Sequence, residues 1–111
     1  MRIDVYMSRG CGHEEAVRQI IDEALEEANA TGTEVTFVQV DSPEEARAKK
    51  VFGSPTVRVN GMDAEYAERE PEETAVGCRY YATPEGWKPV PPRGMIVRAI
   101  NVARAREQKS G

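Results

Sequence analysis

The sequence predicts an α/β fold in which a four-stranded mixed sheet carries helices on both faces, with the elements in the order β-α-β-α-β-β-α. Stretches rich in β-branched and aromatic residues alternate with stretches whose apolar residues recur at helical spacing. The length of 111 residues and the apolar fraction of 40% fit one domain with one core. We therefore expect a single domain over residues 1–107 and a frayed C-terminal tail over residues 108–111.

The first half of the chain is typical of a βαβ unit. Residues 2–7 alternate in part between apolar and polar side chains, which predicts a short strand. A helix is expected from about Gly12 to Ala30, because its apolar residues form one stripe: Ala16, Val17, Ile20, Ile21, Ala24, Leu25 and Ala28. Residues 33–40 predict a second strand. Two strands on either side of one helix indicate parallel pairing.

The second half contains two more helices and two more expected strands. Residues 42–51 begin with Ser-Pro-Glu-Glu, a sequence that caps and starts a short helix. Residues 56–59 predict a strand that ends at the Asn60-Gly61 turn. Residues 78–82 are expected to form the returning antiparallel strand. The last helix is expected over residues 93–106, with an apolar stripe of Met95, Ile96, Ala99, Ile100 and Ala103.

Charge and hydropathy exclude several classes of protein. The net charge of −4 argues against a nucleic-acid-binding protein, which needs a basic face. Six acidic residues between Asp63 and Glu73 are expected to form a solvated loop. The first residues lack the apolar stretch of a signal peptide, and no window approaches the roughly 18 apolar residues of a membrane helix. We therefore expect a cytoplasmic protein without membrane contact, in which thiols stay reduced.

Two local motifs stand at informative places in this order of elements. Cys11 follows the first strand and opens the first helix, and Gly53-Ser54-Pro55-Thr56 comes just before the third strand. With both motifs in place, nearly the whole chain resembles the thioredoxin-like superfamily. The segment GSPTVRVNG with the later CRYY is similar, more narrowly, to small bacterial thioredoxin-like proteins, some of which are grouped with alkylmercury lyases. The resemblance implies a cis peptide bond before Pro55, next to Cys11, and a partner chain held by this loop.

The chain also departs from the family pattern. Thioredoxins carry Cys-x-x-Cys, whereas Cys11-Gly12-His13-Glu14 has a glutamate in place of the second cysteine. The motif is somewhat similar to the Cys-Gly-Phe-Ser of monothiol glutaredoxins. The Gly-Gly-x-Asp segment with which those proteins grip glutathione is missing from the sequence. We therefore expect neither glutathione nor an iron–sulfur cluster, and no other cofactor.

The candidate catalytic residues are Cys11 and Pro55, and the candidate substrate-binding residues are Ser54, Thr56 and His13. Only a thiolate attacks, and a helix N-terminus stabilises a thiolate. His13 is either a partner of that thiolate or an exposed residue of the first helical turn. A closed zinc site usually needs four protein ligands, and the sequence has no Cys/His cluster to supply them, so no metal site is expected.

Cys78 is expected to be a structural core cysteine. If residues 78–82 return antiparallel to residues 56–59, Cys78 lies at the end of the hairpin away from Pro55, on the order of 10 Å from it. A disulfide needs Cα atoms within about 7 Å, so Cys11 and Cys78 are not expected to be bonded. Tyr80, Tyr81 and Trp87 either line a cleft or pack the sheet; packing is favoured for the two tyrosines, and Trp87 is expected to fold back as a lid on the core. Arg79 and Arg93 have the charge to bind an anionic ligand, but surface arginines are common, so no ligand is assigned to them.

Two functions remain open from the sequence, besides a degenerate domain that serves only for interaction. The first is thiol–disulfide oxidoreductase chemistry with Cys11 as the single nucleophile, acting on a protein or small-molecule thiol or disulfide, with an external thiol resolving the mixed disulfide. The alternative is a non-catalytic binding module for a soft metal ion or a peptide in the same groove. The oligomeric state does not follow from the sequence.

Overall fold

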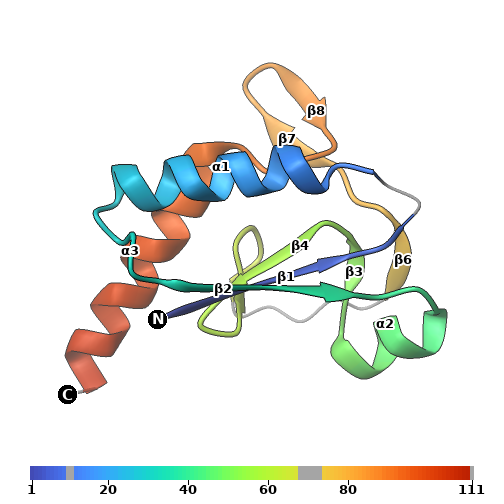
Figure 1. Ribbon diagram of the computed structural model, residues 1–111, viewed down its shortest axis with the longest axis horizontal. Coiled ribbons are helices and arrows are strands. Elements are labelled where there is room, and N and C mark those ends of the chain that lie inside the picture. The colour runs from blue at the N-terminus through green and yellow to red at the C-terminus, as the bar shows by residue number, and fades with distance from the viewer. Residues whose placement is uncertain (10–11, 68–73, 111) are drawn as a thin grey trace.

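The computed structural model describes residues 1–9, 12–67 and 74–110 and has a mixed α/β architecture with a four-stranded mixed sheet and three helices (Figure 1). The strand order of the sheet is β2-β1-β4-β5, with bounds Arg2–Met7 for β1, Glu34–Gln39 for β2, Thr56–Val59 for β4 and Met62–Asp63 for β5. β1 is parallel to β2 and antiparallel to β4, and β5 is antiparallel to β4. The predicted βαβ unit with parallel strands is thus confirmed.

Helices cover both faces of this sheet. α1 (Glu14–Glu27) and α3 (Arg93–Ser110) pack together over one face, and α2 (Pro43–Lys49) lies against the other (Figure 1). Successive side chains of a strand point to opposite faces, so both faces of β1 can be buried. Its odd-numbered residues contact α1 and α3, and Tyr6 contacts the small cluster around α2.

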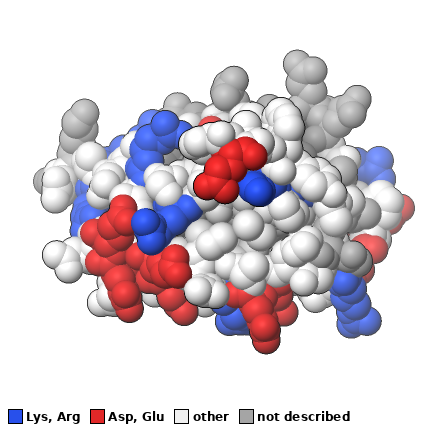
Figure 2. All heavy atoms as spheres, turned by 90° about the horizontal axis from the view of Figure 1, so that it is seen from above, with Lys and Arg blue, Asp and Glu red and all other residues white. Residues whose placement is uncertain are grey.

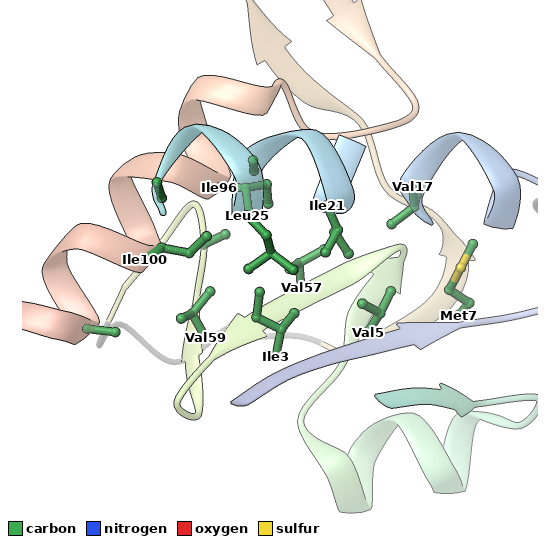
Figure 3. Close-up of a cluster of buried hydrophobic side chains, with 14 residues drawn as sticks. Ile3, Val5, Met7, Val17, Ile21, Leu25, Val57, Val59, Ile96 and Ile100 are labelled. Carbon is green, nitrogen blue, oxygen red and sulfur yellow. The ribbon is translucent and has the colours of Figure 1, made fainter. Parts of the chain in front are cut away.

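The main core lies between the sheet and the helix pair (Figure 3). Most of the predicted apolar stripes face this core, although Ala16 of α1 is exposed. The side chains that carry it are almost fully removed from water: Ile3, Val5, Val17, Ile21, Val57, Val59, Ile96 and Ile100. Burying one such side chain contributes about 1.5–3 kcal/mol, which makes this layer the main source of folding free energy.

The short helix α2 begins as its sequence predicts. The Oγ of Ser42 accepts a hydrogen bond from the N–H of Glu45 at 3.1 Å, and Pro43 occupies the first helical position. Lys50 caps the C-terminal end of the helix with a left-handed φ of 56°. Ala46 of α2 is buried with Val40 and Val51 in the second, smaller core.

The expected returning strand at residues 78–82 is wrong. The antiparallel neighbour of β4 is β5, because the chain turns back at once through Asn60-Gly61. Residues of the expected strand belong to two other pairs of strands. β6 (Ala75–Cys78) runs parallel to β3 (Phe52–Ser54), and β7 (Tyr81–Thr83) forms an antiparallel hairpin with β8 (Gly86–Lys88).

Two further expectations are changed by the structure. Trp87 does not fold back as a lid: it lies on β8 with 71% of its surface exposed, because the β7–β8 hairpin projects from the body of the molecule (Figure 1). The last helix continues beyond Arg106 to Ser110, into the segment expected to be frayed.

Acidic and basic side chains lie interspersed among uncharged ones on the face seen in Figure 2. Within the described ranges, no helix is both long enough and apolar enough to span a bilayer.

Gly53, in the middle of β3, provides a test of how tightly the strand that carries Cys78 packs. Its φ is +112°, and a Cβ at this position would lie 2.6 Å from the Cβ of Arg79. We predict that Gly53→Ala lowers the free energy of unfolding by about 2–5 kcal/mol, from backbone strain and overpacking together. Urea titration measures this loss.

The matched control is Gly32→Ala. A Cβ at this position meets no atom within 4 Å, so the substitution should change stability by less than about 1 kcal/mol. Equal losses in the two variants would contradict the prediction.

Candidate functional site

Ser54 connects the end of β1 to β6. Its Oγ accepts a hydrogen bond at 2.9 Å from the N–H of Ser8, the residue after β1. Its carbonyl accepts another at 2.8 Å from the N–H of Arg79, and in the β3–β6 pairing its partner is Cys78. Ser54 is buried, so water does not compete for these bonds. The end of β1, the loop before β4 and the Cys78 strand therefore meet at one place (Figure 1).

The Ser54–Pro55 peptide bond is cis, as expected from the family resemblance. The carbonyl of Pro55 accepts a hydrogen bond from the hydroxyl of Tyr81, and the hydroxyl of Thr56 donates to the carbonyl of Gly53 at 2.6 Å. Ser54 and Thr56 are both buried, and their hydroxyls bond to the chain's own backbone. Their expected contact with a partner chain stays a prediction.

Cys78 is exposed and disulfide-bonded. The expectation of a structural core cysteine outside any disulfide is therefore wrong. The chain has one other cysteine, Cys11, which lies outside the described residues. Exposed disulfides are typically the labile, regulatory or catalytic ones, because an attacking thiolate can reach them.

The direction of one strand explains the error. An antiparallel return would place Cys78 away from Pro55, but β6 runs parallel to β3. Its last residue therefore lies beside Ser54, directly before Pro55. The antiparallel position that the sequence analysis gave to residues 78–82 is filled by β5.

Arg79, the residue after Cys78, is the centre of a buried cluster of charges. Its guanidinium donates two hydrogen bonds to the carboxylate of Asp63, at 2.8 and 2.9 Å, and one to Glu65 at 3.0 Å. The side chains of Arg79 and Asp63 are 5% and 6% exposed, and that of Glu65 is 16% exposed. We call these three residues the Arg79 cluster. Bidentate pairs of this kind are strong and fix the orientation of both groups.

The two charges at the centre of the cluster stabilise each other. Burial on its own would raise the pKa of Asp63, but the hydrogen bond and charge of Arg79, with the N–H groups of Tyr66 and Glu65, hold this pKa below its usual value. Burial opposes the charge of Arg79, yet the bonds to Asp63 raise the pKa of the guanidinium. Both groups are therefore ionised at neutral pH.

Two tyrosine rings complete the surroundings of Arg79. Its guanidinium carbon lies 4.5 Å from the ring centre of Tyr81 and 5.1 Å from that of Tyr66. Tyr81 is buried, as its expected packing role requires, and burial raises the pKa of its hydroxyl. Tyr80 is instead 56% exposed, so the expected packing role is wrong for this residue.

A groove of about 480 Å³ opens at the carboxyl ends of β1 and β2. Arg9 and Gly12, the described residues on either side of Cys11 in the sequence, both line it. Arg18 and Phe37 form another part of the wall, with the guanidinium carbon 3.8 Å from the ring centre. His13 caps α1 and is half-buried, but its side chain makes no capping hydrogen bond to the helix.

Comparison with family models, with curated proteins and with solved structures finds no match to this chain. No group of three or more His, Cys, Asp and Glu side chains within residues 1–9, 12–67 and 74–110 is arranged to hold a metal ion. The interpretation of the site therefore depends on its own geometry.

The Arg79 cluster does not follow from the residue pattern of the sequence. Asp63 and Glu65 look like the start of the acidic loop, and Arg79 looks like an ordinary surface arginine. The available signal is the Asn60-Gly61 turn. A two-residue turn sets the register of the strand that follows, which makes Asp63 a sheet residue opposite Arg58 and not a loop residue.

We predict that Asp63→Asn lowers the free energy of unfolding at pH 7 by about 2–4 kcal/mol. The substitution replaces the carboxylate that pairs with the buried Arg79 guanidinium by a neutral amide. The folded-state pKa of Asp63 is below its unfolded value. Its contribution is therefore complete above the unfolded pKa of about 3.9 and is lost as the pH falls through the folded pKa.

Urea titrations at pH 7 and near pH 3 measure both effects. The difference between wild type and Asp63→Asn should shrink in acid. The exposed Asp22 of α1 provides the control, since Asp22→Asn should change stability by less than about 0.5 kcal/mol. A loss for Asp63→Asn that is the same at both pH values would argue against this role of the charge.

Proposed function

We propose that this protein is a thiol–disulfide oxidoreductase with a thioredoxin-like fold, in which Cys11 is the nucleophile and Cys78 the resolving cysteine. The observation that carries the proposal is an exposed, disulfide-bonded Cys78 beside Ser54 and the cis bond to Pro55. Cys11 is the only other cysteine that the chain can supply for an internal disulfide.

The architecture supports the fold part of this proposal. The strands of the main sheet and the three helices follow the expected order β-α-β-α-β-β-α in β1, α1, β2, α2, β4, β5 and α3, and the short strands β3, β6, β7 and β8 are additional to it. Pro55 immediately precedes β4, and Cys11 falls between β1 and α1 in the sequence. These are the two places at which the resemblance puts the reactive cysteine and the proline.

The start of α1 favours Cys11 as the attacking thiolate. A helix N-terminus presents N–H groups without helical partners and a partial positive charge. The side chain of His13 makes no capping hydrogen bond to the helix, so it does not compete with a nearby anion for these groups. Glu14 and Glu15 in the first turn oppose the effect, and Arg18 pairs with Glu14 at 2.9 Å and offsets part of that charge.

The proposed reaction begins with the dithiol form of the protein. The Cys11 thiolate attacks one sulfur of a partner disulfide, the partner S–S bond breaks, and the leaving thiolate takes a proton from water. The Cys78 thiolate then attacks the sulfur of Cys11, which forms the internal disulfide and releases the second partner thiol. The partner gains two electrons, and an external dithiol returns them to the protein. The Cys78 step replaces the external thiol that the sequence analysis assigned to resolution.

Peptide mapping without reductant tests the pairing, and a single-turnover assay tests the chemistry. We predict that the oxidised protein yields a Cys11–Cys78 cross-linked peptide and that the reduced protein reduces a peptide disulfide. Cys11→Ser should abolish the reaction. Cys78→Ser should form the first bond but retain the partner as a mixed disulfide on Cys11, which mass spectrometry detects.

Rates of alkylation of the reduced protein provide the internal control. The variant that retains only Cys11 should label faster at neutral pH than the variant that retains only Cys78, because the helix N-terminus stabilises the thiolate. Oxidoreductase function is excluded if neither cysteine attacks a disulfide or if Cys11→Ser stays fully active. Retained binding of a soft metal ion or a peptide in that case would favour the non-catalytic binding module.

A further inference from the structure

We propose that the Arg79 cluster is a positioning device, which holds Cys78 at the site when its disulfide is reduced. This inference rests on the proposed function, because it concerns the resolving step. Arg79, Asp63 and Glu65 would act through Cys78, so they are positioning residues and not catalytic ones. The device belongs to the fold and does not need the disulfide.

The cluster holds the chain immediately beside the cysteine. Arg79 directly follows Cys78 in the chain. Its backbone N–H donates a hydrogen bond to the Ser54 carbonyl at 2.8 Å, and its side chain donates hydrogen bonds to the Asp63 carboxylate. Asp63 belongs to β5 at the edge of the main sheet, so the bonds tie Cys78 to a rigid element. Arg79 is thus held by hydrogen bonds to three groups: the Ser54 carbonyl, the Asp63 carboxylate and the Glu65 carboxylate.

The packing around Arg79 leaves the strand little freedom to move. Position 53 has no room for a Cβ, because the Cβ of Arg79 occupies that space. The Tyr81 hydroxyl binds the carbonyl of Pro55, so the chain is attached to the same loop on both sides of exposed Tyr80. Cys78 is exposed to a partner, whereas the residue that follows it is buried and held in place.

Such an anchor changes the equilibrium of the disulfide and not only the stability of the fold. A dithiol whose second sulfur is already held at the site loses less conformational freedom on closing the bond. The oxidised form is then stabilised relative to the reduced form. The reduction potential of the disulfide falls, and the protein becomes a stronger reductant of its partner. A substitution that only lowers global stability acts on both forms alike and leaves this equilibrium unchanged.

Redox titration in buffers of oxidised and reduced dithiothreitol, followed by alkylation and mass analysis, measures the equilibrium. We expect Asp63→Asn to weaken the internal disulfide about tenfold, which corresponds to roughly 30 mV for a two-electron couple, and Glu65→Gln about threefold. Glu65→Gln keeps the Arg79–Asp63 pair, so it remains informative if Asp63→Asn fails to fold. The control Ile100→Val, on α3, creates a small cavity in the main core and should change the equilibrium less than about twofold.

A second measurement reads the anchor without redox chemistry. In Cys11→Ser, which cannot form the internal disulfide, hydrogen exchange at the Arg79 amide should stay as slow as in the oxidised wild type. Adding Glu65→Gln should accelerate it about tenfold, through loss of a hydrogen bond between charged groups.

The two measurements separate the failure of this inference from the failure of the proposed function. Loss of Arg79 amide protection in Cys11→Ser overturns the anchor, whatever the protein does to disulfides. Unchanged redox equilibria in folded Asp63→Asn and Glu65→Gln overturn its effect on Cys78. A protected amide in a protein that reduces no disulfide leaves the anchor in place and rejects the proposed function.

Discussion

The Arg79 guanidinium is buried between two carboxylates, and a buried cation that lost such partners would destabilise the fold by several kcal/mol. This requirement connects regions of the chain that the main core does not join. Asp63 has to lie on β5, and Arg79 has to follow β6 and approach Gly53 closely. The place of Cys78 next to Ser54 follows from these contacts, so the candidate site depends on this pair of charges.

Local signals were sufficient to predict the part of the fold that the main core holds. The stripe of α1, the cap at Ser42 and the Asn60-Gly61 turn each depend on a few neighbouring residues, whereas the cis bond before Pro55 was expected from the family resemblance. Burial of a helical stripe against alternating strand residues then leaves few ways to assemble them. The prediction of a mixed sheet with helices on both faces succeeded for this reason.

The site was harder to predict, because its geometry depends on pairing between distant segments. Residues 78–82 contain the adjacent aromatic residues Tyr80 and Tyr81, which favour a strand, but this preference does not specify a partner strand or a direction. The parallel pairing of β6 with β3 moved Cys78 from the far end of an expected hairpin to the residue opposite Ser54. Arg79 and Asp63 were missed because burial turned residues with a surface character into the polar centre of the site.

In a Cys-x-x-Cys motif one turn of helix sets the distance between the sulfurs, so local structure controls the redox pair. In the arrangement proposed here the second cysteine comes from another element, and tertiary packing sets that distance. An internal disulfide between Cys11 and Cys78 would close a long loop. In the chain-entropy description this raises the free energy of the unfolded chain by about 4 kcal/mol. The oxidised product of each turnover would then be the more stable form. The free energy gained in that form would drive the reduction of the partner, which couples the reducing power of the protein to the integrity of its fold.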